Sequence, residues 1–383
     1  MRAPRETWGS SMQAIIRFHD DPLFCDDGST EIALRIWLSS AGAASTQVMR
    51  MLRENPESAA VRIYGTNISA TAPALMACDV AEVEPYRVND HVYAEFALDF
   101  CRRHGIDVLI PPRRLDALAG RAEEFARAGT RLMCAPPAAV NVLTSKSRTY
   151  EAARAAGIPV PEWRVVRDAD QLRTAVEELG RPGESLCIKP AGEYSAFGFR
   201  IFDDGPLRLR DLLEAPRPLV SVTAVADALK RAADEEEKVP SFIVMPYLEG
   251  PEVSVDTLSA PGGRLLAAVP RAKDGRYRLL LDDPEATGIA RAVVEHFGLA
   301  YLANVQLRRL RGASVLLEAN PRPSAGVYQT AFSGLNLPWA AVRLLVHGDP
   351  GELPPPRLGG RIAVTETAAE VHPAVTAPAA HGS

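Results

Sequence analysis

The sequence predicts a chain of mixed α/β and α+β class, with a parallel-sheet α/β domain toward its N-terminal side. Two observations carry this prediction. Apolar runs of strand length alternate with segments of helical spacing between residues 34 and 137, and such alternation is typical of a parallel sheet with right-handed crossovers. Farther along, ANVQLRRLRGASVLLEAN (303–320) places two apolar runs around a predicted turn at Gly312, which is typical of an antiparallel hairpin.

Length and composition bound the class of protein. The chain has 383 residues, of which 47% are apolar and 24% charged, as in ordinary soluble globular proteins. This length allows two or three domains and a sizeable core. A net charge of −5 gives no general reason to expect nucleic acid as a partner.

Targeting signals and cysteine usage point to the cytoplasm. No apolar stretch approaches the ~18–20 residues that span a bilayer, so we expect no membrane partner. Acidic residues interrupt any apolar run near the N-terminus, which is unlike a signal peptide. Five cysteines lie far apart without a CxxC pair. That pattern favours reduced, mostly buried thiols over a disulfide framework or a zinc site.

The first domain is expected to contain four strands and three helices, with one short alternating segment. We predict strands at 34–40, 61–67, 106–112 and 130–137, helices at 41–55, 91–105 and 115–129, and an apolar–polar alternation at 77–85. The helix over 91–105 ends at Gly105, as helices commonly do.

The rest of the chain mixes strands and helices in another order. We predict a helix that begins near residue 145 and stops at Gly157, then an extended Pro159–Pro161 segment that leads into a strand. Further strands are expected at 185–192, 197–204, 241–250, 253–259 and 361–367, with a helix at 219–238. After Gly348 the composition turns to Pro, Gly and Ala, and residues 373–383 are expected to be disordered.

These segments divide the chain into four parts. Residues 1–30 are irregular, residues 31–140 form the N-terminal α/β domain, and residues 141–350 form a second domain with a lid at about 160–245. A C-terminal strand and a flexible tail occupy 351–383.

The stretch LLEANPRP (316–323) carries the most chemical information. Side chains two apart on a strand share a face, so Glu318 and Asn320 are expected to lie together, with Arg322 close behind. A hairpin centred on Gly312 would place Gln306 opposite Glu318, since each lies six residues from it. Oxygen ligands beside a fixed cation suit a magnesium-bound polyphosphate. A polar strand edge in a structural hairpin is the alternative.

A second chemical signal is Lys189 at the end of the apolar run SLCIKP. A buried ammonium is expensive unless a partner compensates its charge. Polyphosphate would be such a partner, and a strand-end lysine that reaches solvent is the alternative.

Taken together, five segments resemble the ATP-grasp superfamily in its order along the chain. The resemblance is closest to the branch of the carbamoyl-phosphate synthetase large subunit, biotin carboxylase and L-amino acid ligases, and it covers about residues 32–348. It implies an N-terminal α/β domain followed by an ATP-grasp domain, in which a small lid and a larger subdomain clamp ATP between two antiparallel sheets.

The resemblance implies the residues that bind nucleotide phosphates. Lys146, just before GIPVP, matches the first family lysine, and Lys189 matches the second. The lid loop matches GEYSAFGF (192–199), in which Gly192, Ser195 and Gly198 are the small residues that let backbone N–H groups approach phosphate oxygens. This loop has fewer glycines than is usual in the family.

The resemblance also implies how adenosine is held. The hinge matches IVMPYLEGPEVSVD (243–256), where Met245 and Pro246 replace the usual Gln-Glu pair. Tyr247 and Leu248 would hydrogen-bond the adenine edge through their backbone, and Glu252 would bind the ribose hydroxyls. A solvated loop carboxylate is the alternative for Glu252.

The metal site is implied at Gln306, Glu318 and Asn320, which would bind Mg²⁺ or Mn²⁺ that bridges the phosphates of ATP. Glutamine as the first ligand is the carbamoyl-phosphate synthetase pattern. Arg322 matches the arginine that stabilises the phosphorylated intermediate. Arg271, in VPRAKDG, lies where relatives hold the acceptor or the γ-phosphate, although a solvated basic turn is an alternative.

The resemblance implies an ATP-dependent carboxylate–amine ligase that acts through an acyl phosphate on an amino acid or a small peptide-like metabolite. The acid pocket is expected between the N-terminal domain, residues 271–280 and residues 324–336. Two alternatives stay open: a bicarbonate-phosphorylating enzyme like carbamoyl-phosphate synthetase, and a non-catalytic ATP-binding sensor. Relatives are often dimers, so a homodimer is allowed.

Overall fold

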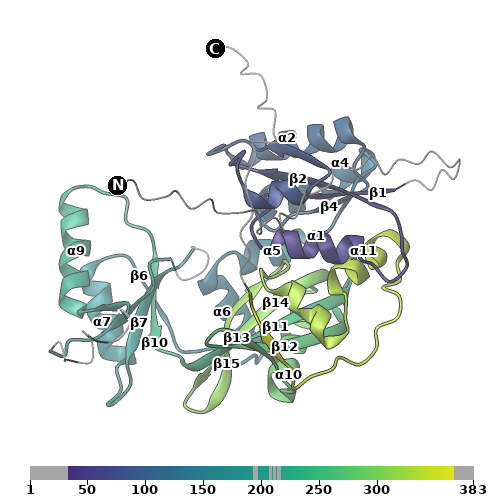
Figure 1. Cartoon of the computed structure of the whole chain (residues 1–383). Helices are drawn as coiled ribbons and strands as arrows, with labels where there is room; N and C mark the ends of the chain where they lie inside the picture. Colours follow the sequence, from purple (N-terminus) through teal and green to yellow (C-terminus); the bar gives the residue numbers. More distant parts are fainter. Residues whose placement is uncertain (1–32, 193–196, 207–208, 210–212, 214–216, 366–383) are drawn as a thin grey trace, which may run out of the picture. The chain divides into compact units, whose positions relative to one another are not determined.

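The computed structural model describes residues 33–192, 197–206, 209, 213 and 217–365. The described residues fall within one compact unit, Ala33–Ser383. The expectations for residues 1–30, for Ser195 and for the flexible C-terminal tail lie outside the described residues. Figure 1 shows the arrangement of the elements.

The first sheet is parallel and has the strand order β3-β2-β1-β4-β5, which confirms the predicted α/β class of this part. Its strands are β1 (Leu34–Leu38), β2 (Val61–Asn67), β3 (Val80–Val83), β4 (Val108–Ile110) and β5 (Arg131–Leu132). The connecting helices are α1 (Ser45–Arg53), η1 (Pro73–Ala77), α2 (Asp90–His104), α3 (Leu115–Leu118), η2 (Ala119–Arg121) and α4 (Ala122–Arg127).

The predicted single helix over 115–129 was wrong. The structure divides it into α3, the 3-10 turn η2 and α4. Gly120 lies in η2, and glycine is a poor helix former. Arg121 donates to both Glu124 and Glu95, and these bonds tie the turn to α2. By contrast, α2 follows the prediction because Asn89 caps its first turn and Gly105 ends it with φ +58°.

The second sheet has the order β6-β10-β7-β8-β9. Its pairs are antiparallel except for β8 with β9. The strands are β6 (Arg164–Val166), β7 (Leu186–Pro190), β8 (Arg200–Phe202), β9 (Leu219–Val220) and β10 (Phe242–Pro246). Helices α7 (Ala169–Leu179) and α9 (Val222–Asp234) pack with this sheet through Leu172, Ala175, Ala226 and Leu229.

The third sheet has six antiparallel strands in the order β15-β14-β11-β12-β13-β16. They are β11 (Glu249–Ala260), β12 (Arg264–Asp274), β13 (Tyr277–Leu280), β14 (Tyr301–Leu310), β15 (Ala313–Asn320) and β16 (Arg361–Ala363). The remaining helices are α5 (Pro137–Leu143), α6 (Lys146–Ala155), α10 (Pro284–His296), η3 (Val327–Ser333) and α11 (Leu337–His347). The predicted C-terminal strand is β16, and it joins this sheet beside β13.

The two faces of the six-stranded sheet are treated differently. Helix α10 covers one face, with Ala290 and Val293 against Val255 and Val305. On the other face, one end of the strands is apolar and packs under α11 and α1, as Leu258, Val269 and Leu302 show. The opposite end of that face is polar, and the candidate site lies there.

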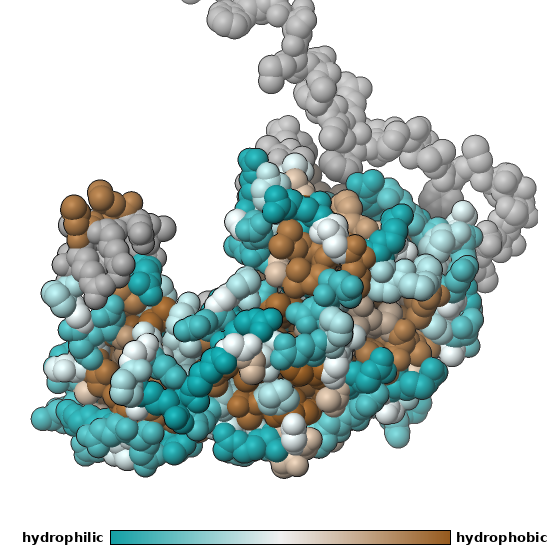
Figure 2. Space-filling view, turned by 90° about the horizontal axis from the view of Figure 1, so that it is seen from below, coloured by the Kyte–Doolittle hydropathy of each residue, from teal (hydrophilic) through white to brown (hydrophobic). Residues whose placement is uncertain are grey.

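The surface mixes hydrophobic and hydrophilic residues, as the face in Figure 2 shows. A few large apolar side chains, such as Phe332 and Tyr86, are exposed. No helix among the described residues is both long and apolar enough to cross a membrane.

Candidate active site

Antiparallel pairing sets a row of polar side chains across the six-stranded sheet. The register places Glu318 opposite Gln306, Gln306 opposite Ser254, and Ser254 opposite Arg271. Directly opposed residues put their side chains on one face. The row therefore runs from a carboxylate through an amide and a hydroxyl to a guanidinium, over strands spaced ~4.8 Å apart.

A second row lies one step along the strands. Asn320 stands opposite Asn304, and Asn304 stands opposite Asp256. The Nδ2 atom of Asn304 donates to Ser254 Oγ at 2.8 Å and to Asp256 Oδ1 at 3.0 Å. These hydrogen bonds compensate the burial of Asn304 and Asp256, each 1% exposed.

The predicted pairing of Gln306 with Glu318 is confirmed, but for a different reason. Strands β14 and β15 are joined by a two-residue turn at Arg311 and Gly312, both with positive φ, as a type I′ hairpin requires. That turn alone would place Gln306 opposite Leu317. The register shifts next to Gln306, and the shift leaves Leu317 as one extra residue in β15. This β-bulge brings Glu318 opposite Gln306.

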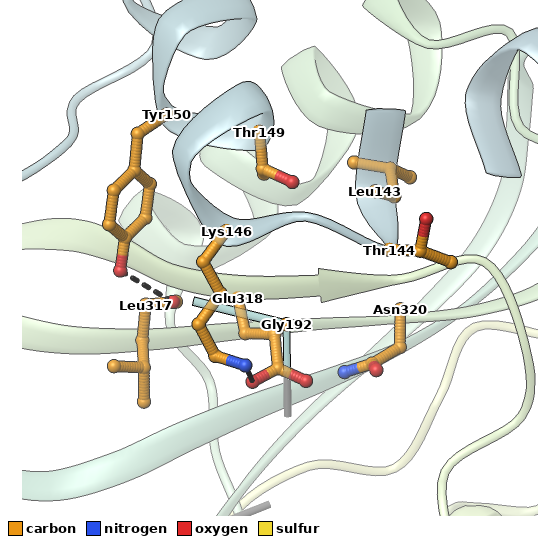
Figure 3. Close-up of a pocket in the computed structure, with 9 residues that line it drawn as sticks. All are labelled: Leu143, Thr144, Lys146, Thr149, Tyr150, Gly192, Leu317, Glu318 and Asn320. Atoms are coloured by element: carbon orange, nitrogen blue, oxygen red, sulfur yellow. Dashed lines mark hydrogen bonds and ion pairs between the residues drawn. The ribbon is translucent and has the colours of Figure 1, made fainter. Parts of the chain in front are cut away.

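A small pocket collects four of the predicted site residues. Lys146, Gly192, Glu318 and Asn320 all line it, and Figure 3 shows the Lys146 and Glu318 side chains meeting end to end. The Lys146 Nζ atom lies 3.7 Å from Glu318 Oε2. Helix α6 starts at Lys146, so this ammonium is presented at the helix end that faces β15. The pocket thus joins a cation to the oxygen-rich edge of the sheet.

Tyr150 links the bulge to the second predicted lysine. Its hydroxyl donates to the Leu317 carbonyl at 2.8 Å, and Lys189 Nζ lies 3.4 Å from the same hydroxyl. Burial raises the pKa of Tyr150, which keeps the hydroxyl protonated as a donor. Tyr150 lies on α6 four residues after Lys146, and therefore on the same helix face.

Lys189 is buried at 7% exposure. Desolvation lowers the pKa of its ammonium, although the Glu318 carboxylate acts in the opposite direction. The folded protein therefore holds this charge at a cost, as a site for a polyanion would. The sequence expectation that Lys189 is a buried ammonium in need of a partner agrees with this environment.

We predict that Lys189→Met raises the melting temperature of the ligand-free protein at pH 7. The expected gain in the free energy of unfolding is ~0.5–2 kcal/mol, the usual range of stabilising substitutions. The pKa of Lys189 is lower in the folded state, so the unfolded chain binds more protons between the two pKa values, and wild-type stability rises with pH there. The gain from Met should therefore shrink as pH approaches ~10.4, the value of a solvated lysine. Thermal melts at several pH values measure this, and a variant less stable than wild type at pH 7 would contradict it.

At the hinge after β10, the Tyr247 N–H donates to the Ser185 carbonyl at 2.8 Å. This N–H serves the sheet, so a backbone contact of Tyr247 with the adenine edge would use its carbonyl. In an extended segment successive N–H groups point to opposite sides, which leaves Leu248 N–H as the expected donor. The Leu248 carbonyl accepts from Arg308 at 2.8 Å, and this guanidinium also lies over the Tyr247 ring. Met245 is a core residue whose sulfur lies 3.9 Å from the Tyr150 hydroxyl.

Glu252 follows the hinge at the start of β11 and is half-buried. Burial raises the pKa of its carboxyl, Arg308 opposes the shift, and Glu318 adds to it. The carboxylates of Glu252 and Glu318 therefore repel each other electrostatically, which places Glu252 near the candidate site.

Arg271 is clamped at the far end of the first row. Its Nε donates to Asp256 Oδ2 at 2.6 Å, and Nη2 donates to Ser324 Oγ at 2.7 Å. A Cβ atom at Gly326 would lie 2.5 to 2.6 Å from the guanidinium, so only glycine lets it lie flat against this backbone. Arg271 is 9% exposed, which is unlike the solvated basic turn considered from the sequence.

A larger pocket opens beside Arg271, at the place where the sequence predicts the acid pocket. Its volume is about 420 Å³, within the range of small-molecule sites. It is lined by residues at the start of α1 and just before it, by residues of the strands β12 and β13, and by the segment around η3: Ala43, Ala44, Gln47, Arg271, Arg278, Ala325, Gly326, Tyr328 and Gln329.

Two predicted residues are placed apart from the small pocket. Arg322 follows β15, half-buried, and its Nη1 donates to the Pro323 carbonyl. Gly198 has φ +67°, and a Cβ there would lie 2.8 Å from the Pro190 ring, so it packs on the end of β7. The expectation for Ser195 lies outside the described residues.

Sequence reasoning missed several residues of the site. Ser254 and Asp256 alternate with valines in VSVD, and Asn304 precedes Gln306 by two in ANVQ. A search for polar side chains in alternation with apolar ones would have found these. Tyr150 and Arg308 give no such signal, because their roles depend on contacts between elements far apart in the sequence.

Comparison with known proteins relates part of the chain to a family. A family model described as "ATP-grasp in the biosynthetic pathway with Ter operon" matches residues 238–368. The chain therefore contains a region that matches the ATP-grasp family. A second model, the PylC-like N-terminal domain, matches residues 36–133.

A curated relative of this chain is the carbamoyl phosphate synthase large chain of Mycobacterium tuberculosis (strain ATCC 25618 / H37Rv). The two are 25% identical over 267 residues. The match covers 68% of this chain and 22% of the relative, so this chain spans about a fifth of that protein's length.

Solved structures show the same fold. The biotin carboxylase domain of the 2-oxoglutarate carboxylase from Hydrogenobacter thermophilus superposes with a TM-score of 0.61 at 15% identity, over 85% of this chain and 73% of that chain. The L-amino acid ligase from Bacillus licheniformis gives 0.57 at 13% identity, over 82% and 74%. N5-carboxyaminoimidazole synthetase from Staphylococcus aureus, complexed with ADP, gives 0.60 at 14% identity, over 85% and 80%.

Proposed function

We propose that this protein is an ATP-dependent carboxylate–amine ligase that forms ADP and acts through an acyl phosphate. The observation that carries the proposal is the small pocket in which Lys146, Glu318 and Asn320 converge, with Gln306 opposite Glu318. The ATP-grasp family match over residues 238–368 and the similarity to the carbamoyl phosphate synthase large chain support it. Two of the similar solved structures contain MgADP and ADP, which supports ATP and Mg²⁺ as the nucleotide and metal here.

The donor set fits a metal that arrives with its nucleotide. Glu318 supplies one carboxylate, and Gln306 and Asn320 supply neutral amide oxygens, which are ligands that Mg²⁺ accepts. Because only one of these three ligands is charged, most of the affinity for the metal would come from the phosphates of ATP. When bound, the metal would neutralise charge on the transferred phosphoryl group.

The chain's own residues would then position ATP and the acid and stabilise the charge on the transferred phosphoryl group. Lys146 lines the small pocket, and Lys189 Nζ lies 3.4 Å from the hydroxyl of Tyr150, which also lines it. Each of these two cations suits a phosphate group of ATP. Leu248 N–H is the adenine donor, and Glu252 the ribose ligand. Transfer of the γ-phosphoryl group to a carboxylate oxygen gives ADP and an acyl phosphate. An amine nitrogen attacks the acyl carbon, loses a proton and expels inorganic phosphate with the C–O electron pair.

Arg271 and Arg322 are proposed to stabilise the negative charge that develops during both steps. No protein nucleophile takes part in this scheme. The 420 Å³ pocket beside Arg271 has room for an organic acid, and this favours an organic substrate over bicarbonate.

The test is ADP release by the purified full-length protein with Mg²⁺–ATP, screened against amino acids, other small carboxylic acids and bicarbonate. Each acid is tested with and without an amine mixture. We expect release that depends on one class of organic acid. Release with bicarbonate alone would favour a carbamoyl-phosphate-synthetase-like reaction. Tight ATP binding without release from any pool would favour a non-catalytic nucleotide-binding protein.

A further inference from the structure

The polar face of the six-stranded sheet is divided by charge. Glu318 and the amides of Gln306 and Asn320 lie on β15 and β14, while Arg271 lies on β12. The register continues the basic side onto β13, because Arg278 stands opposite Lys273, which is two residues from Arg271 and so on the same face. The proposed metal ligands and the arginines of this face therefore lie on different strands of the sheet.

Arg278 is the uncompensated cation of the larger pocket. It is half-buried, and its hydrogen bonds within the described residues all use Nη1, which donates to the carbonyls of Gly275 and Tyr277. It forms no ion pair with any carboxylate among the described residues. Arg271 differs, since Asp256 offsets its charge at 2.6 Å.

The other walls of the larger pocket add no negative charge. The described lining residues include no aspartate or glutamate, and the first turn of α1 has no acidic residue. Tyr328 and Gln329 contribute a phenol and an amide. An α-ammonium group in this pocket would meet guanidinium groups without a carboxylate to bind it, whereas an anion would be attracted.

We propose that the acid substrate carries a second anionic group, which Arg278 binds while the reacting group lies toward Arg271. The substrate class is thus dicarboxylates or phosphorylated acids, and not amino acids with a free ammonium group. Arg271 and Arg278 are diagonal neighbours on adjacent strands, a separation of ~7–8 Å, and both line the larger pocket, so one small molecule can reach both. This inference rests on the proposed function for the identity of the reacting group, but the binding itself is independent of turnover.

The test measures binding and turnover separately. Dicarboxylates from malonate to adipate are titrated calorimetrically into the full-length protein with Mg²⁺–ADP, each beside its monoamide, with phosphoglycolate as the phosphorylated acid and γ-aminobutyrate as the ammonium-bearing acid. The same acids are then assayed for ADP release from ATP. The variants are Arg278→Met and, as the matched control, Arg276→Met, an exposed arginine of the same turn that stacks on Tyr277.

We expect a dicarboxylate or the phosphorylated acid to bind more tightly than the monoamides and γ-aminobutyrate, each of which lacks the second anionic group. Whichever of the two dianions binds more tightly identifies the second anionic group. Arg278→Met should weaken that binding about 10- to 100-fold, the usual effect of losing a hydrogen bond between charged groups. Arg276→Met should leave it unchanged, and neither variant should alter nucleotide affinity.

The outcomes separate the inference from the proposed function. Monoamides or γ-aminobutyrate that bind as tightly as the dianions, no binding of any acid, or an Arg278→Met variant with unchanged affinity would each overturn the inference. Dianion binding that depends on Arg278, without acid-dependent ADP release, would sustain the inference and overturn the ligase reaction. ADP release with amino acids alone would sustain the ligase reaction and overturn the inference.

Discussion

Glu318→Gln is expected to lower acid-dependent ADP release about 10²- to 10³-fold, the usual effect of removing one charge-stabilising group from an active site. The substitution keeps the side-chain volume but removes the charged metal ligand of a donor set whose other members are neutral amides. It also removes the partner that lies 3.7 Å from Lys146 Nζ. Steady-state ADP release, with Mg²⁺ titrated at fixed ATP, measures the effect.

The control for this variant is a carboxylate that binds the tip of the same hairpin. Glu184 binds Arg311 through two hydrogen bonds of 2.7 and 2.8 Å, outside the small pocket. Glu184→Gln should leave ADP release unchanged at every Mg²⁺ concentration. If Glu318→Gln kept activity within a few-fold of wild type, with an unchanged melting temperature, Glu318 could not be the metal ligand we propose.

Asp256→Ala is expected to destabilise the fold by about 3–5 kcal/mol, because it leaves the buried Arg271 guanidinium without its carboxylate. Asp256 is 1% exposed, and the substitution also removes an acceptor from Asn304 Nδ2. Both effects leave buried donors without a partner, which costs more than the bonds contribute when made. Denaturant unfolding measures the change in the free energy of unfolding.

An exposed ion pair supplies the comparison for Asp256. Asp170 pairs with Arg173 at 3.0 Å with a carboxylate that is 96% exposed, and Asp170→Ala should change stability little. The double substitution Asp256→Leu with Arg271→Met should recover much of the loss, since it removes both buried charges. Equal effects of Asp256→Ala and Asp170→Ala would show that Arg271 does not depend on its buried partner.

Alternation in the sequence was enough to place the metal-site residues on strands. The period of two in a strand puts Glu318 and Asn320 on one face whatever the strand packs against. Their pairing with Gln306 was predicted from symmetry about Gly312, yet the two-residue turn is centred half a residue earlier. Only the bulge at Leu317 restores the pairing, and nothing local in LLEAN marks a bulge. The Tyr150 hydroxyl on the Leu317 carbonyl shows that a contact from α6 supports it.

The sequence by itself determined the class of the fold, many of its strands and helices, and the type of side chain at each candidate position, because periodicity and chemical character are local properties. The tertiary structure decided which of these side chains meet. It took the Tyr247 N–H into the sheet, joined Arg271 to Asp256, and placed Arg278 in the larger pocket without a carboxylate partner among the described residues. These outcomes depend on register, burial and the partners that distant segments bring, and such contacts have no signature within any single segment.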